Sequence, residues 1–419
     1  MTCFFRFMLN IFFKNIIIEG NVPDDVPVII ACNHRNALID GMMLTSKTKR
    51  IMHLMTKATL FKNKFLRFLF RTCHAIPVHR RQDQINNAHT DNTLGLSEAV
   101  NTLLENKCFG IFPEGMSHSD TYIHELKKGI AHIAIDAAKR GKKIIYIVPT
   151  GINYIDPSKF RSDCIIKHGE PIMVTHESNV DNLMADINNE LSKVTISTKN
   201  KEDMDVMDMM TNIYLSHNCN FKSNEYINIK KTIINKLTGN DICQKTSDYI
   251  QKLKQSNFTD EIIRYSTKNN DIFMNIINFI FGMILIIPSI IINFPIIMTV
   301  MMSMKYIIKE DTNIQNAKLL KVYGKDMAAT IKILSVLVSG FLMYTIASCI
   351  ILNNYNLMTL IITYICYIII TYVGILGYDI LSDSHYCIGM FTKNIIYRNK
   401  IKEIKILREN LREEISRLI

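Results

Sequence analysis

The residue pair with the most recognisable chemistry is His34 and Asp40, within residues 33–41 (NHRNALIDG). This segment follows the apolar run VPVIIAC, so a strand ending there presents His34 at the carboxyl end of a sheet, where α/β proteins place reactive groups. A histidine becomes a general base when a carboxylate fixes the tautomer of its ring, and Asp40 is close enough in sequence to do so. The alternative is a solvated pair on a surface loop, because single motifs have a high false-positive rate.

A second candidate is the Phe-Pro-Glu-Gly segment at residues 112–115, which follows the apolar run CFGIF. Pro-Glu-Gly after a strand is a turn, in which Gly115 can supply a positive φ. In a functional interpretation, Glu114 and an exposed Gly115 amide contact a polar substrate. The residues by themselves leave both interpretations open.

Paired arginines follow a third apolar run, in residues 76–81 (IPVHRR). Arginine suits phosphate because its guanidinium donates two parallel hydrogen bonds, which makes Arg80 and Arg81 candidate phosphate ligands. A basic rim at a membrane surface explains the pair equally well. A fourth segment, residues 148–154 (VPTGINY), is interpreted as a passage from a strand into a loop, and it contains Pro149 and Tyr154.

In this order and at these separations, the four segments resemble the glycerophospholipid acyltransferase family. Its blocks are a His-x4-Asp, an Arg after a strand, an FPEG and a late VP strand, and the likeness covers residues 15–175. FPEGMSHSD is more similar to the yeast-type glycerol-3-phosphate acyltransferases than to lysophosphatidate acyltransferases, which usually have FPEGTR.

Two positions depart from that family's pattern. Five residues instead of four separate His34 from Asp40, and His74 stands where a glycine is usual. A loop at a helix start can absorb one residue, whereas a helix interior would rotate Asp40 by about 100°. We therefore keep the His-Asp pair as the predicted catalytic dyad.

The resemblance implies transfer of a fatty acyl group from acyl-CoA to the sn-1 hydroxyl of glycerol 3-phosphate, giving lysophosphatidate at the first step of glycerolipid synthesis. It implies that His34 takes the hydroxyl proton and that Asp40 stabilises the imidazolium. Five residues would then bind the acceptor: Arg80, Arg81, Lys57, Glu114 and Gly115. No metal, cofactor or covalent intermediate is implied, because CoA thiolate is a good leaving group and positioning with proton removal suffices.

Other functions remain open. The same dyad would serve an enzyme that acylates lysophosphatidate or another lysophospholipid. An inactive membrane scaffold would not need both His34 and Asp40. A transporter usually needs charged residues in its apolar segments, and these segments have none. Nucleic-acid binding is not expected, because a chain with 48% hydrophobic residues and a net charge of +11 is basic but too apolar.

The elements that must position these residues form an α/β pattern. Short apolar runs bounded by turn signals predict strands at 16–18, 28–31, 76–78, 109–112 and 144–148, with helices at 94–106 and 124–140. We expect a mixed sheet covered by helices, forming a catalytic domain over residues 19–180. A polar helical region should follow over residues 181–268.

The composition then becomes apolar. Residues 272–304 carry no charge and contain Pro288 and Pro295, while residues 333–378 predict a two-helix transmembrane hairpin. Lys and Arg on both flanks of that hairpin place the flanks in the cytoplasm. A single crossing at 272–304 would put the catalytic domain on the other side. We therefore expect this segment to turn back near its prolines, as a re-entrant or membrane hairpin.

The two ends of the chain complete this organisation. Arg6 and Lys14 interrupt the Phe-rich residues 1–18, which favours an interfacial amphipathic helix over a signal peptide. Ten cysteines without CxxC spacing indicate a reducing compartment. We expect an integral membrane protein with a cytoplasmic catalytic domain and a basic cytosolic tail at 379–419. In a eukaryote its site would be the endoplasmic reticulum membrane.

Overall fold

The computed structural model describes residues 2–79, 93–215, 223–265, 272–313 and 328–419. The described chain divides into an α/β unit, made mainly of Met1–Lys201, and a helical unit made of most of the remainder. Each unit has its own hydrophobic core.

The α/β unit is built on a mixed sheet, as predicted. In the described residues it has eight strands, in the order β1-β7-β6-β2-β5-β3-β4 with β8 beside β6. The central strands are parallel to each other, and β7 and β8 run antiparallel to β6. The strands are β1 (Ile16–Glu19), β2 (Val28–Cys32), β3 (Met52–Lys57), β4 (Ile76–Val78), β5 (Cys108–Ile111), β6 (Ile145–Tyr154), β7 (Cys164–His168) and β8 (Ile172–Val174).

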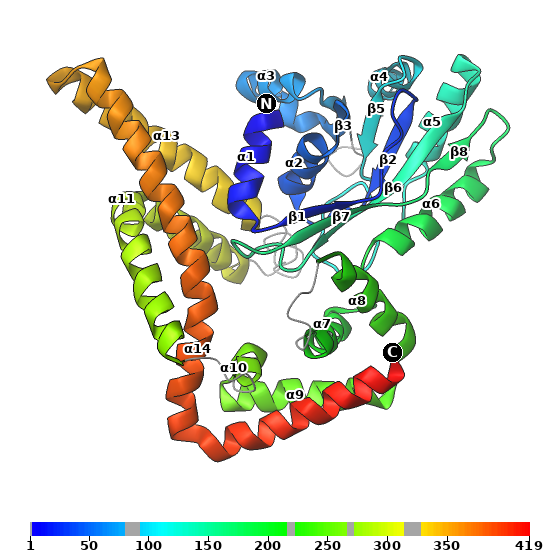
Figure 1. The fold of residues 1–419 in the computed structure, drawn as a ribbon. Helices are drawn as coiled ribbons and strands as arrows, with labels where there is room; N and C mark the ends of the chain where they lie inside the picture. Colours follow the sequence, from blue (N-terminus) through cyan, green and yellow to red (C-terminus); the bar gives the residue numbers. More distant parts are fainter. Residues whose placement is uncertain (1, 80–92, 216–222, 266–271, 314–327) are drawn as a thin grey trace. The chain divides into compact units, whose positions relative to one another are not determined.

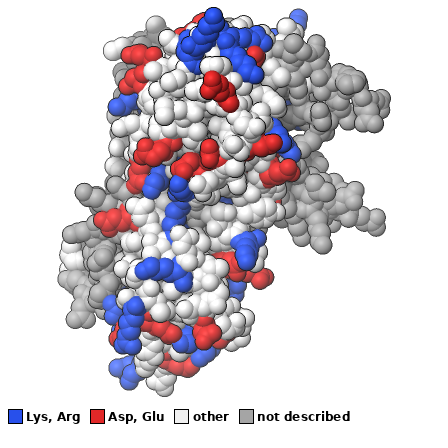
Figure 2. Space-filling view, turned by 90° about the vertical axis from the view of Figure 1, so that its right-hand side faces the viewer, with Lys and Arg blue, Asp and Glu red and all other residues white. Residues whose placement is uncertain are grey.

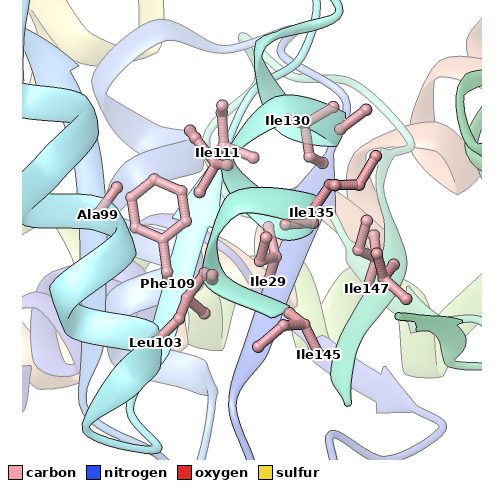
Figure 3. Packing of buried hydrophobic residues seen from close by; sticks show 14 of the residues in the cluster. Ile29, Ala99, Leu103, Phe109, Ile111, Ile130, Ile135, Ile145 and Ile147 are labelled. Carbon is pink, nitrogen blue, oxygen red and sulfur yellow. The ribbon is translucent and has the colours of Figure 1, made fainter. Parts of the chain in front are cut away.

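Helices α4 (Thr93–Leu104), α5 (Gly129–Gly141) and α6 (Val180–Val194) bury one face of this sheet. Figure 3 shows the packing: Phe109 and Ile147 of the strands meet Leu103 of α4 and Ile135 of α5. Helix α6 contributes Leu183 and Ile187 to the same core, so the α/β unit extends past the expected boundary at residue 180.

Four shorter segments complete the α/β unit: α1 (Thr2–Phe12), α2 (Ala37–Lys47), the 3-10 helix η1 (Ala58–Phe61) and α3 (Lys64–Thr72). Helix α1 packs against α2, and its Arg6 donates two hydrogen bonds to the Ser46 carbonyl. The α1 residues Leu9 and Phe12 are buried, while Phe4 and Phe7 are exposed. One face of this amphipathic helix is therefore part of the fold.

In the helical unit, α7 (Lys201–Leu215), α8 (Ser223–Leu237), α9 (Asp241–Ser256) and α10 (Asp260–Tyr265) surround the end of α14 (Leu357–Leu418). Ile404, Leu411 and Ile415 of α14 are buried in this core. The end of the segment expected to form a basic cytosolic tail (379–419) therefore packs in the core of this unit. Its apolar residues recur at helical spacing and need a packing surface.

Three helices of this unit are long and apolar enough to cross a membrane. The apolar stretches are Phe273–Lys305 of α11 (Ile272–Asn313), Ala328–Asn354, which is α13, and Leu357–Ser382 of α14. Their large apolar side chains are mostly exposed, which suits contact with lipid. These helices indicate membrane association.

Helix α11 reverses its direction near its prolines. Gly282 lies against Gly377 of α14, and Ser289, which directly follows Pro288, lies against Gly374, so this arm of α11 is antiparallel to α14. After the prolines, Ile296 contacts Gly340 and Ser303 bonds to Ser335 of α13 at 3.0 Å, again antiparallel. Because α13 and α14 themselves form an antiparallel hairpin, the two arms of α11 run in opposite directions (Figure 1). Prolines inside a helix are the usual cause of such a bend.

A buried ion pair joins α10 to α14 in the core of the helical unit. Arg408 is 1% exposed and donates to both carboxylate oxygens of Asp260, at 2.8 and 3.0 Å. The Tyr249 hydroxyl donates to the same carboxylate at 2.8 Å. Removal of one partner of a buried pair leaves the other charge uncompensated.

Asp260→Ala should therefore destabilise the helical unit by about 3–5 kcal/mol, visible as a lower apparent melting temperature in detergent. Glu403→Gln is the matched control, because Glu403 of α14 pairs with Lys252 of α9 at 3.2 Å on the exposed surface of the same unit. Exposed pairs contribute little, so this change should leave the melting temperature nearly unchanged. Equal shifts in the two variants would contradict the structural role of the buried pair.

Candidate active site

The predicted site residues follow the carboxyl ends of neighbouring parallel strands. His34 follows β2, Glu114 follows β5, and Lys57 ends β3. The register pairs Ala31 with Ile111 across β2 and β5 and Leu54 with Gly110 across β3 and β5. All three segments therefore reach the same edge of the sheet, as expected for a site in an α/β protein.

His34 and Asp40 form the predicted dyad. His34 Nδ1 lies 2.9 Å from Asp40 Oδ2, and both side chains are buried. Asp40 is in the first turn of α2, and the additional residue in this motif is taken up where the loop enters the helix. There Ala37 adopts a φ of 36°, in the left-handed region. The contact thus survives the longer spacing at the cost of local backbone strain.

Asp40 has two further hydrogen bonds that hold it beside the histidine. The Asn36 amide donates to Asp40 Oδ2 at 2.7 Å, and the Tyr154 hydroxyl donates to Oδ1 at 2.6 Å. Burial, and then the Asp40 charge, raises the pKa of Tyr154 well above its ordinary value, so the hydroxyl stays protonated and donates. With both oxygens engaged, the carboxylate has a fixed orientation.

Glu114 fixes the backbone of His34 from the neighbouring strand. Its Oε1 accepts the His34 amide at 2.8 Å, and its Oε2 accepts the His124 amide at 2.8 Å and pairs with His118 Nε2. Burial alone would raise the pKa of this carboxyl, but the hydrogen bonds from His118 and the two amides outweigh it and lower the pKa. Glu114 is 2% exposed, so both of its carboxylate oxygens bond to groups of the protein itself.

More hydrogen bonds join the loop after β5 to the loop after β2. The His118 amide donates to the His34 carbonyl at 3.1 Å, and the Ala37 amide donates to Ser117 Oγ at 3.1 Å. The Gly115 amide donates to the Phe112 carbonyl at 3.0 Å in a turn where Gly115 has a φ of 76°. The expectation of an exposed Gly115 amide is therefore wrong, because the turn uses that donor.

This arrangement can remove a proton from a bound hydroxyl group. An ionised Asp40 keeps the proton of the imidazole on Nδ1, which leaves Nε2 as the nitrogen that accepts a proton. The His34 ring also stacks on Phe112, with centroids 4.0 Å apart and planes at 11°. The ring position is therefore set by the carboxylate, the backbone and an aromatic face together.

The remaining predicted residues are placed as follows. Lys57 pairs in register with Val78 at the catalytic edge, while Arg80 and Arg81 lie outside the described residues. His74, which replaces the usual glycine, has a φ of 56°, a conformation that glycine adopts most readily. The unusual side chain thus occupies a glycine-like turn just before β4.

Three residues of this network had no role in the sequence analysis. Asn33 exchanges two hydrogen bonds with the Ile152 backbone of β6, at 2.8 and 3.1 Å, and thereby continues the pairing of β2 past its end. His118 bonds Glu114, and Tyr154 bonds Asp40. Their position in the sequence is the indication that could have identified them, because each residue lies within or just after one of the four motifs.

Possible metal ligands gather in the described residues at His118, Asp120 and His124, which place one ligand atom each within 4.8 Å of the others. Two existing contacts account for these side chains: His118 bonds Glu114, and His124 Nε2 bonds Asp120 at 2.8 Å. The His118 and His124 rings also stack at 3.9 Å. The cluster is thus explained by its role in supporting Glu114.

Comparison with known families agrees with this geometry. Residues 15–153 match a family model described as Acyltransferase, and residues 208–419 match the model described as Glycerol-3-phosphate acyltransferase 2 C-terminal domain, over half of the chain. The chain belongs to this acyltransferase family.

Two relatives come from Saccharomyces cerevisiae. Glycerol-3-phosphate O-acyltransferase 2 is 23% identical over 94% of this chain and 54% of its own length. Glycerol-3-phosphate O-acyltransferase 1 is 30% identical over 31% of this chain and 19% of its own length. The chain thus spans about half, or less, of the length of these relatives.

The solved structure of the 1-acyl-sn-glycerophosphate acyltransferase of Thermotoga maritima is 20% identical. The comparison covers 46% of this chain and 76% of that one, with a TM-score of 0.37.

Tyr154→Phe tests whether the hydrogen bond to Asp40 positions the dyad. Hydrogen bonds to charged groups contribute roughly 1.5–3 kcal/mol. We therefore expect kcat to fall by about ten- to a hundredfold, with little change in the KM for the acyl donor or in the KM for the acceptor. Tyr146→Phe, at the other end of β6, is the matched control. Unchanged kcat in Tyr154→Phe, with both variants folded, would contradict the positioning role.

Proposed function

We propose that this acyltransferase transfers a fatty acyl group from acyl-CoA to the sn-1 hydroxyl of glycerol 3-phosphate, giving lysophosphatidate. The observation that carries the proposal is the buried His34–Asp40 contact at 2.9 Å, at the edge where parallel strands end. The C-terminal family match and the names of the two yeast relatives support glycerol 3-phosphate as the acceptor.

In the proposed reaction, His34 Nε2 takes the proton of the acceptor hydroxyl as its oxygen attacks the thioester carbonyl. The carbon–sulfur bond then breaks, CoA leaves as the thiolate, and the imidazolium proton is returned to it. Asp40 stabilises the positive charge on the ring while that charge exists, and Tyr154 holds the carboxylate in place. Positioning and proton removal are the two contributions required from the protein.

Glu114 acts in this proposal as a positioning residue. One oxygen of its carboxylate accepts a hydrogen bond from the His34 amide, and the other bonds to His118 and the His124 amide. These contacts support a role in holding the dyad in place. The phosphate of the acceptor would be bound by Lys57, which ends β3 at this edge, and by Arg80 and Arg81, which lie outside the described residues. A multiply charged phosphate would be attracted there before its hydroxyl reaches His34.

The apolar helices fit this reaction because acyl chains and the lysophosphatidate product both partition into lipid. We further propose that α13 and the first part of α14 cross the membrane as a hairpin. The two arms of α11 would then enter and leave on the cytoplasmic side, and the catalytic domain would face the cytoplasm. In a eukaryotic cell the endoplasmic reticulum would be the corresponding membrane.

An assay with radiolabelled acyl-CoA tests the proposal directly. We expect the purified protein in nanodiscs to acylate glycerol 3-phosphate in preference to lysophosphatidate offered at the same concentration. His34→Ala should lower the rate by about 10²–10⁴-fold, the usual contribution of a general base. If the protein acylates lysophosphatidate in preference, the proposed acceptor is wrong, but the proposed role of His34 and Asp40 is unaffected. Wild-type turnover in His34→Ala would refute the mechanism.

A further inference from the structure

The positive charge of this chain is concentrated in one part of the sequence. Residues 41–82 contain ten Lys and Arg and no Asp or Glu, while the whole chain has a net charge of +11. Figure 2 shows one face of the molecule. Acidic and basic side chains are mixed over most of this face, and Lys and Arg gather at its upper end. A run without acidic residues attracts anions with no competing internal partner nearby in sequence.

Within this segment, η1 and α3 are fixed to the α/β unit on one side. Phe61 is buried and packs against Phe70, with ring centroids 5.6 Å apart. Arg67 donates to the Phe61 carbonyl at 2.8 Å, and Arg71 pairs with Glu98 of α4 at 2.7 Å. The helix is therefore held in one orientation.

The other side of this pair of helices presents apolar and basic side chains together. Phe68 is 68% exposed and Leu60 is 37% exposed, and Lys62 and Lys64 are exposed beside them. Lys64 and Phe68 are four residues apart on α3 and so lie on the same face of the helix. A lysine beside an exposed aromatic ring can extend its long side chain to a lipid phosphate while the ring enters the membrane interface.

This surface lies at the edge of the sheet that carries the dyad. Lys57 is the last residue of β3, and η1 begins at the next residue, Ala58. A surface that binds the bilayer here would hold the active-site edge at the interface, where acyl chains arrive and lysophosphatidate leaves.

We propose that η1 and α3 dock onto the anionic surface of a phospholipid bilayer. Phe68 and Leu60 enter the interface between headgroups and acyl chains, and Lys62 and Lys64 contact the phosphates. A soluble anion such as CoA would explain the lysines but not the exposed Phe68, which favours the bilayer as the partner. This surface adds a contact to those made by the apolar helices, and it does not depend on which acceptor is used.

The chain has no tryptophan, so one introduced residue provides the whole Trp fluorescence signal. Phe68→Trp should be quenched at least about twofold in phosphatidylglycerol/phosphatidylcholine nanodiscs when the phosphatidylcholine carries brominated acyl chains, because bromine quenches a ring at interfacial depth. Ile51→Trp is the matched control. Ile51 is 67% exposed and precedes β3 at the opposite edge of the sheet, so its fluorescence should be unchanged.

A second arm tests the charges. Adding Lys62→Gln and Lys64→Gln to Phe68→Trp should weaken the quenching, since each basic group near an anionic membrane surface strengthens the attraction to it. Quenching of Phe68→Trp no greater than that of Ile51→Trp would overturn the proposal. A raised KM for acyl-CoA in the lysine variant, with lipid quenching absent, would assign the surface to a soluble anion instead.

Discussion

The Glu114 carboxylate connects the two loops on which the site depends. It reaches across 80 residues of sequence to accept the His34 amide, and His118 and the His124 amide hold its second oxygen. A buried carboxylate without these donors would be costly, so the loop after β5 can adopt its turn only where the loop after β2 is also in place. The position of the dyad and the fold of residues 112–124 therefore depend on each other, and both depend on the strand order that places β2 beside β5.

The contact between His34 and Asp40 could be anticipated because both residues lie within one motif next to a fully buried strand, while their catalytic role stays a prediction. The sequence could not predict the role of Tyr154, whose contact with Asp40 spans 114 residues, or that of Glu114, which resembles a substrate ligand when taken alone. Strand β6 also continues past Pro149, a residue that usually marks the end of a strand. Long-range hydrogen bonds are not visible in local patterns.

Domain limits were harder to predict than elements. Helix α6 has polar residues on most of its surface, yet Leu183 and Ile187 bury it against the sheet. The last residues of α14 look basic and exposed in sequence, but Arg408 pairs with Asp260 inside the helical core. In both cases a few apolar or paired residues at helical spacing decide the packing, while the average composition indicates a linker or a tail. The apolar segments, by contrast, were evident from composition because three uncharged stretches rarely occur in a soluble core.

The most direct test of this site is the separation of kcat from KM in Glu114→Gln. Glutamine keeps the shape of the side chain, but its amide cannot accept hydrogen bonds from His34, His118 and His124 together. If Glu114 positions the dyad, kcat should fall by about ten- to a hundredfold while KM for glycerol 3-phosphate stays the same. A raised KM for glycerol 3-phosphate with unchanged kcat would show instead that Glu114 binds the acceptor, and would contradict the positioning role.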